Sequence, residues 1–184
     1  WTAPQPRVNV TLESQMTIQA DSAEWVAMLQ YDVPGGALDA IRLKLSPAWA
    51  GGARIQLPGR EYQLRSETLN GSTYWTITPD RPIWGRQTLF VRSSLGLSPG
   101  QEVQHPEITP LGRGVADTYL ALVDATASTL TTAGSSGLQQ IAYSGRFRHK
   151  EFGQMPGFQT RAYHVERDNW SLKGQIPPAT DGAR

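Results

Sequence analysis

Apolar and polar residues alternate along roughly the first hundred positions, and turn-forming residues interrupt the pattern about every eight to twelve positions. This period of two is typical of antiparallel strands with one buried face. The pattern predicts an all-β fold, an antiparallel β-sandwich of immunoglobulin-like or jelly-roll-like type. The predicted strands cover residues 7–12, 15–20, 24–32, 37–45, 53–56, 62–68, 73–78 and 87–93.

Three segments between these strands have the residues that tight turns require. Pro34-Gly35-Gly36 joins the third and fourth predicted strands, and Pro58-Gly59 precedes the sixth. Asn70-Gly71 lies between two alternating runs, and both of its residues tolerate positive φ, as the central pair of a two-residue hairpin must. The sequence therefore predicts a β-hairpin centred on Asn70-Gly71.

The remainder of the chain is less regular. We divide it into residues 1–98, the sandwich strands; 99–116, a linker or crossover rich in Pro and Gly; 117–173, further strands on the same core; and 174–184, a flexible end. Strands are predicted at 118–124 and 159–165. Residues 125–137 are interpreted as a loop or a weak helical turn, and residues 138–143 as a short strand or helix.

Composition and charge narrow the possible partners. The 17 basic and 16 acidic side chains leave a net charge of +1, which disfavours a nucleic-acid or membrane-surface role. Cysteine is absent, so the chain has no thiol nucleophile or cysteine metal site. No apolar run approaches the roughly 20 residues that span a bilayer. Because the chain starts at Trp1 rather than Met, we interpret it as a mature product or a piece of a longer protein.

Several segments together resemble a known class of protein. They are LDAIRLKLSP at 38–47, YWTI at 74–77, GRQTLFV at 85–91 and HPEITP at 105–110. Their order resembles that of β-sandwich segments in large extracytoplasmic proteins of bacterial cell envelopes, particularly of planctomycete type. The resemblance covers about two thirds of the chain and rests on strand pattern and turns. It implies a periplasmic, envelope or secreted location and no known activity.

Aromatic residues are the first candidate for binding chemistry. Rings exposed on a β-sandwich can stack on the C–H faces of sugars, and the candidates are Trp49, Tyr74, Trp75 and Trp84. Tyr74 and Trp75 are adjacent on a predicted strand, so one of them faces outward or lies at an edge. The alternative, which we favour, is that these rings fill the core.

A short basic segment is the second candidate. Arg146, Arg148 and Lys150 form a basic patch if the segment is a strand, with Phe147 and His149 on the opposite face. Such a patch can contact a phosphate or an acidic partner. The interpretation that we favour is an ordinary solvated strand with a buried Phe. The three histidines are isolated in sequence and predict no metal site, and the chain has no nucleophile elbow or nucleotide-binding motif.

These observations favour a noncatalytic protein without a cofactor. The expected function is a structural or interaction module of a larger envelope protein, with another envelope protein as its partner. The alternative is a carbohydrate-binding module that contacts polysaccharide through its surface aromatics.

Overall fold

The computed structural model describes residues 7–112, 114–126, 131–143, 146–153, 159–176 and 178. These residues form mainly antiparallel strands with very little helix, in sheets that do not close into a barrel. The predicted all-β, sandwich-like fold is therefore confirmed. None of the helices in the described ranges has the length and apolar character needed to span a membrane.

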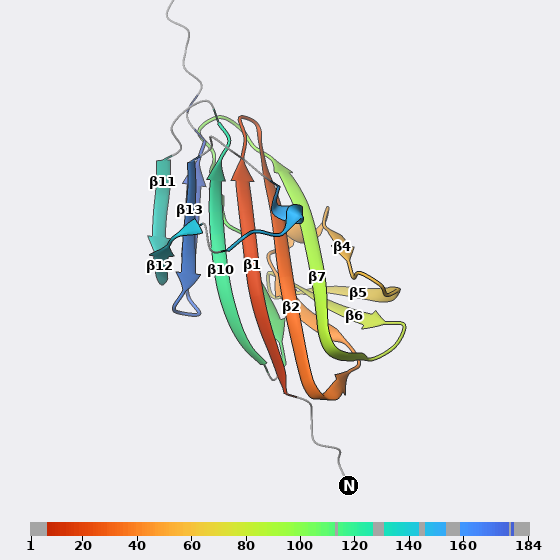
Figure 1. The fold of residues 1–184 in the computed structure, drawn as a ribbon. Helices are drawn as coiled ribbons and strands as arrows, with labels where there is room; N and C mark the ends of the chain where they lie inside the picture. The colour runs from red at the N-terminus through yellow and green to blue at the C-terminus, as the bar shows by residue number, and fades with distance from the viewer. Residues whose placement is uncertain are drawn as a thin grey trace, which may run out of the picture. The chain divides into compact units, whose positions relative to one another are not determined.

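The described strands form three sheets. The largest has seven strands in the order β12-β13-β10-β1-β2-β7-β4, and Figure 1 shows β13, β10, β1, β2 and β7 side by side. Their bounds are β1 (Val8–Ile18), β2 (Ser22–Leu38), β4 (Arg54–Gln56), β7 (Ile83–Gly96), β10 (Gly114–Asp124), β12 (Leu138–Ile141) and β13 (Gln159–Val165). The four-stranded sheet has the order β5 (Tyr62–Leu69), β6 (Ser72–Pro79), β3 (Ile41–Leu45) and β9 (Ile108–Leu111). The three-stranded sheet has the order β11 (Thr131–Ser136), β14 (Ser171–Gln175) and β8 (Glu102–Gln104).

The chain divides into two compact units that alternate along the sequence. Unit 1 comprises Trp1–Leu12, Ala27–Ser93 and Pro106–Thr118. Unit 2 comprises Glu13–Val26, Ser94–His105 and Tyr119–Arg184. The long strands β1, β2, β7 and β10 each contribute residues to both units.

Each unit has its own apolar core. In unit 1 the inward positions of β3 and β6 supply fully buried side chains such as Leu43 and Ile77. In unit 2 Trp25 is only 1% exposed, and Leu120 and Leu172 are equally buried. The Trp25 indole N–H donates to the Ser14 hydroxyl over 2.7 Å, so the polar atoms of both side chains are satisfied inside the core.

The predicted hairpin at Asn70-Gly71 is confirmed. Strands β5 and β6 pair in antiparallel register up to Leu69 and Ser72, and the two residues between them have φ values of 50° and 74°. Positive φ at both central positions is the geometry that favours Asn followed by Gly.

Two predicted breaks near the N-terminus are wrong. Residues 7–12 and 15–20 were predicted as separate strands, but β1 continues through them because the intervening Ser14 is buried and hydrogen-bonded. Pro34-Gly35-Gly36 does not reverse the chain, since β2 extends to Leu38. Gly35 adopts a φ of +71° within the strand, so glycine accommodates a local irregularity there.

Strands also occur where irregular structure was predicted. Residues 99–116 contain β8 and β9 rather than only a linker, and β14 extends into the predicted flexible end, where Ile176 is 3% exposed. Residues 131–136 of the predicted loop form β11, whereas residues 127–130 lie outside the described part. Strand β11 is rich in Ser and Thr and lacks a hydrophobic pattern. It forms because its backbone pairs with β14, which is distant in sequence.

Candidate functional site

Two of the four candidate aromatic residues are in the core. Trp49 lies in the short helix α1 (Pro47–Ala50) and is 4% exposed, and its carbonyl oxygen accepts a hydrogen bond from the Ser93 hydroxyl over 2.7 Å. Trp75 is 3% exposed and lies beside Leu43 on the inner face of the four-stranded sheet. A buried ring cannot stack on a ligand from solution, so the assignment of Trp49 and Trp75 to a binding surface is wrong. Both residues stabilise the core of unit 1.

Tyr74 and Trp84 remain accessible. Tyr74 is half-buried on the face of β6 opposite Trp75, as the alternation of a strand requires. Trp84 is 66% exposed near the start of β7, and the following Gly85 has a φ of +67°. Tyr74 and Trp84 therefore remain candidates for ligand binding.

Tyr74 belongs to a mixed polar surface that we call the outer face. It is the side of the four-stranded sheet opposite Trp75 and Leu43. Paired residues of antiparallel neighbours project to the same side of a sheet, so the register defines its members. One cross-strand row contains Arg65, Thr76, Arg42 and Leu111, and the next contains Glu67, Tyr74, Lys44 and Thr109.

The outer face carries uncompensated positive charge. Arg65 forms an ion pair with Glu67, its neighbour on β5. Arg42 is exposed and Lys44 half-buried, and within the described part of the chain neither forms an ion pair. The Tyr74 ring therefore lies between Lys44 and the Arg65–Glu67 pair, in a row that combines charge with one aromatic ring.

A shallow polar hollow adjoins this face. Its volume is about 200 Å³, and its lining includes Lys44, Ser72 and Thr109, which project from the same side of the sheet, together with Glu107. These side chains offer one cationic donor, two hydroxyl groups and one carboxylate. The hollow provides hydrogen-bonding groups at one end of the outer face.

The outer face also reaches a free sheet edge. Strand β5 is the last strand of its sheet, and residues 63–69 are exposed on both sides of the strand. Leu64 and Leu69 are 46% and 57% exposed. An edge strand presents unpaired backbone groups, and the Arg65–Glu67 pair on β5 is the kind of charge that natural edges use to limit unspecific strand pairing.

The basic segment in unit 2 does not form a strand, so the condition for a basic patch on one strand face is not met. Residues 146–149 have no regular structure, and Lys150–Phe152 is a short 3-10 helix, η2. Phe147 is buried as predicted, at 3% exposure, but it has a φ of +57°, and His149 is exposed rather than sharing its side. Arg148 and Lys150 are exposed, whereas Arg146 is half-buried and contacts Glu13 and Tyr119.

Arg146 is held by Glu13 and Tyr119. Its guanidinium lies 3.9 Å from the Glu13 carboxylate, and the guanidinium carbon lies 3.7 Å from the centre of the Tyr119 ring. The Glu13 carboxylate also accepts a hydrogen bond from the Phe147 backbone N–H over 3.1 Å. This arrangement fastens the segment to strands β1 and β10, so Arg146 has a structural role.

The same segment is fixed by Tyr143 and Gln15. The Tyr143 hydroxyl donates to the Gln15 amide oxygen over 3.1 Å, and the Gln15 amide nitrogen donates to the Phe152 carbonyl over 2.9 Å. The Tyr143 ring is stacked on Phe147 at 5.4 Å. Burial, and secondly the Glu13 carboxylate, raise the pKa of Tyr143, which keeps its hydroxyl protonated as a donor.

The cluster around Glu13 was not found from the sequence. Its members come from β1, from β10 and from a segment that follows β1 by about 130 residues. No local motif connects them. His164 pairs with Tyr119 across β10 and β13, with ring centres 4.9 Å apart. Within the described ranges, no three His, Asp or Glu side chains come together as a metal site would require.

No family model matches the chain, and neither does any curated protein. Solved structures with a similar fold include an M1 zinc metallopeptidase from Deinococcus radiodurans, at 12% identity and a TM-score of 0.46, covering 91% of this chain and 42% of that one. Leukotriene A4 hydrolase from Saccharomyces cerevisiae has 6% identity and a TM-score of 0.50, with 91% and 29% covered. A non-cellulosomal cohesin from Archaeoglobus fulgidus has 10% identity and a TM-score of 0.37, with 66% and 92% covered.

At 6% identity and a TM-score of 0.50, the match to the yeast hydrolase shows a likeness of fold alone. The chain spans less than half of the length of the two enzymes.

Proposed function

We propose that the chain is a noncatalytic interaction module of a larger extracytoplasmic envelope protein, and that it binds an acidic partner protein on the outer face. The observation that carries this proposal is the pair of uncompensated cations, Arg42 and Lys44, beside the accessible ring of Tyr74. Interface hot spots are enriched in Tyr and Arg, because both combine apolar contact area with directional hydrogen bonding.

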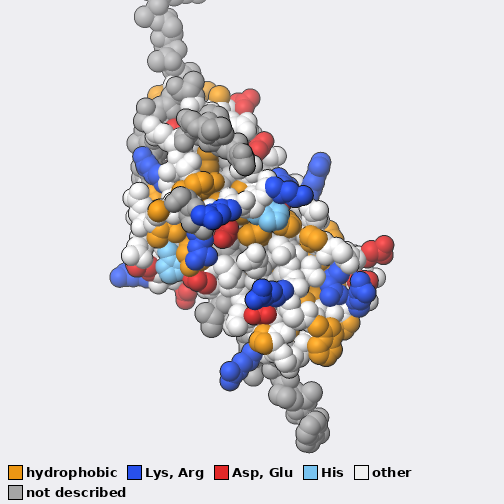
Figure 2. Space-filling view, viewed as in Figure 1, with side chains coloured by type: hydrophobic (Ala, Val, Ile, Leu, Met, Phe, Trp, Pro, Cys, Tyr) orange, Lys and Arg blue, Asp and Glu red, His pale blue; other side chains and the backbone are white. Residues whose placement is uncertain are grey.

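The charge distribution indicates the character of the partner. Arg65 is already paired with Glu67, so the field of the outer face is dominated by Arg42 and Lys44. A carboxylate opposite them is attracted, whereas a second basic surface is repelled. On the face of the molecule shown in Figure 2, Lys and Arg side chains are interspersed with Asp and Glu. The outer face itself combines Arg42 and Lys44 with the Arg65–Glu67 pair, and this mixture of charges fits a local acidic patch on a protein better than a long uniform polyanion.

The noncatalytic part of the proposal is supported by the cluster around Glu13. Its carboxylate and guanidinium bind one another and a backbone N–H, and they hold Phe147 against the sheet. Groups engaged in this way are not arranged as a nucleophile with its base. The envelope location rests on the resemblance of the strand segments to extracytoplasmic proteins.

The proposal is tested by placing a photoreactive benzoylphenylalanine at position 74 and cross-linking the chain to the envelope fraction of its own organism. The cross-linked protein is identified, purified and titrated against the chain. Reversing both cations, Arg42→Glu with Lys44→Glu, should weaken its binding at least about tenfold. Arg54→Glu with Arg86→Glu, two exposed basic residues off the outer face, is the matched control and should have little effect.

Three results would contradict the proposal: no cross-link at position 74, equal losses in both double variants, or binding that does not weaken at higher salt.

A second candidate function has one observation in its favour, the 66% exposure of Trp84. If the chain is instead retained by polysaccharide, and Trp84→Ala abolishes that retention, the carbohydrate-binding alternative replaces the protein partner.

A further inference from the structure

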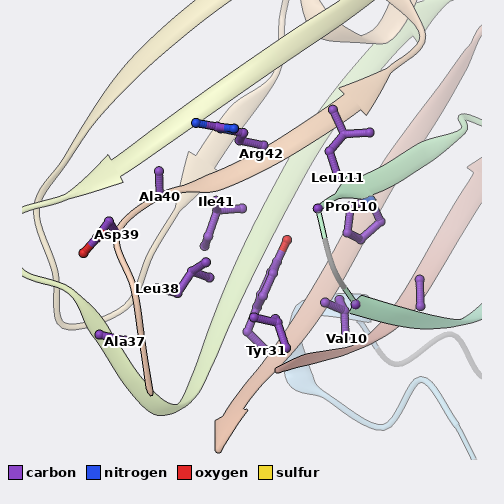
Figure 3. A pocket seen from close by; sticks show the side chains of 14 residues that line it. Val10, Tyr31, Ala37, Leu38, Asp39, Ala40, Ile41, Arg42, Pro110 and Leu111 are labelled. Atoms are coloured by element: carbon purple, nitrogen blue, oxygen red, sulfur yellow. The ribbon is translucent and has the colours of Figure 1, made fainter. Parts of the chain in front are cut away.

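Unit 1 contains an apolar pocket away from the buried tryptophans. Its volume is about 320 Å³, within the range of small-molecule sites. The wall is formed by the start of β1, the end of β2, the following turn, β3 and β9. Figure 3 shows Val10, Leu38, Ile41 and Pro110 around the ring of Tyr31.

Tyr31 supplies the one notable polar group in the depth of this pocket. The residue is 4% exposed, and within the described part of the chain its hydroxyl has no hydrogen-bond partner. In Figure 3 the hydroxyl points into the space between Ile41 and Pro110. A buried hydroxyl without a partner is unfavourable, so a ligand that accepts a hydrogen bond from it gains an interaction that the protein alone does not make.

The charged residues of the lining do not face the interior. In Figure 3 the Asp39 carboxylate and the Arg42 guanidinium both point away from Tyr31. The other side chains of the lining are aliphatic, from Val, Leu, Ile, Pro and Ala, and backbone groups supply the rest of its polar surface. An ionised ligand would lose its hydration there without gaining a counter-charge, so the surroundings select an uncharged molecule.

We propose that this pocket binds a small, uncharged, aliphatic molecule with one carbonyl oxygen, and that the oxygen accepts a hydrogen bond from Tyr31. The hydroxyl oxygen is covered in the structure, so the ligand reaches it after a wall side chain changes rotamer. The site is separate from the outer face of the proposed function, although Arg42 and Leu111 at its rim also belong to that face.

The test uses two probes of nearly equal shape, 2-hexanone and 2-methyl-1-hexene, in which a methylene group replaces the carbonyl oxygen. Binding is followed by NMR of ¹³C-labelled methyl groups. The ketone should shift the methyl signals of Val10, Leu38 and Ile41, which lie around Tyr31. Tyr31→Phe removes only the hydroxyl, and it should weaken ketone binding by about 3- to 10-fold while leaving alkene binding unchanged.

Two further variants locate the site. Leu38→Trp should fill the pocket and abolish binding of both probes, whereas Leu69→Trp, the same change on the exposed strand β5, should not alter it. The proposal is overturned if neither probe shifts these methyl signals, if Tyr31→Phe binds the ketone as well as the wild type does, or if binding persists in a folded Leu38→Trp variant. Equal binding of the ketone and the alkene by the wild type also overturns it, because Tyr31 then contributes nothing.

Discussion

Replacing Tyr31 by Phe should stabilise the protein, whereas removal of a buried polar atom more often destabilises one. The change deletes the hydroxyl oxygen and retains the ring, which is packed in unit 1 at 4% exposure. In the unfolded chain this hydroxyl is hydrated, but in the folded chain it has no partner among the described residues. The folded state therefore carries a penalty that Phe does not have.

The size of the effect follows from that penalty. A buried polar group without a partner costs about 1–3 kcal/mol, and because the adjoining pocket can admit water we take the lower end. Tyr31→Phe should raise the free energy of unfolding by about 1 kcal/mol at pH 7. Tyr143→Phe is the matched comparison, since its hydroxyl donates to Gln15 over 3.1 Å. Losing that bond should lower the free energy of unfolding by about 0.5–1.5 kcal/mol.

The dependence on pH gives a second signature. Burial raises the pKa of Tyr31 above its ordinary value of about 10. Above pH 10 the unfolded chain releases this proton while the folded chain retains it, so ionisation favours unfolding. The free energy of unfolding of the wild type is therefore unaffected by this ionisation below pH 10 and falls as the pH rises further. The advantage of Tyr31→Phe over the wild type should therefore grow above pH 10.

The assay is urea denaturation followed by tryptophan fluorescence, at pH 7 and at several values between pH 9 and 11. The free energies of unfolding of the two variants are compared where their m-values are equal, so that a difference reports stability alone. The reasoning is refuted if Tyr31→Phe is destabilised at pH 7 as much as Tyr143→Phe, because the Tyr31 hydroxyl would then have a partner. It is equally refuted if the difference from the wild type does not change above pH 10.

Three further changes test the fold and the surface. Asn70→Ala with Gly71→Ala should lower the midpoint of thermal unfolding by several degrees, since each Ala at positive φ costs roughly 1 kcal/mol or more; an unchanged midpoint would contradict the hairpin. Glu13→Gln should destabilise unit 2 by about 1–3 kcal/mol, because it removes the counter-charge of Arg146. Hydrogen exchange should show reduced protection of the Phe147 backbone amide, which donates to Glu13, and unaltered protection would contradict the structural role of Glu13. Trp84→Ala should change unfolding free energy by less than about 0.5 kcal/mol in denaturant titrations, because the ring is 66% exposed, and a larger loss would place it in a contact.

The sequence by itself determined the local features of this protein. The predicted bounds of β5, β6 and β13 agree closely with the structure. In β6 the reason is burial, because every second residue of that strand is buried. Asn70-Gly71 fixed its own hairpin, since positive φ is a local backbone preference. The same alternation required that Tyr74 and Trp75 face opposite sides, which the structure bears out.

Tertiary structure decided everything that depends on partners distant in the chain. Strand β11 exists because β14 pairs with it, and β1 continues through Ser14 because Trp25 satisfies that hydroxyl. Arg146 forms an ion pair with Glu13, which lies more than 130 positions away in the chain. An alternating strand pattern contains no information about such a contact. The burial of the candidate rings and the direction of the Tyr31 side chain depend on what packs against each strand face. That packing is a property of the assembled sheets and cannot be read from a local run of residues.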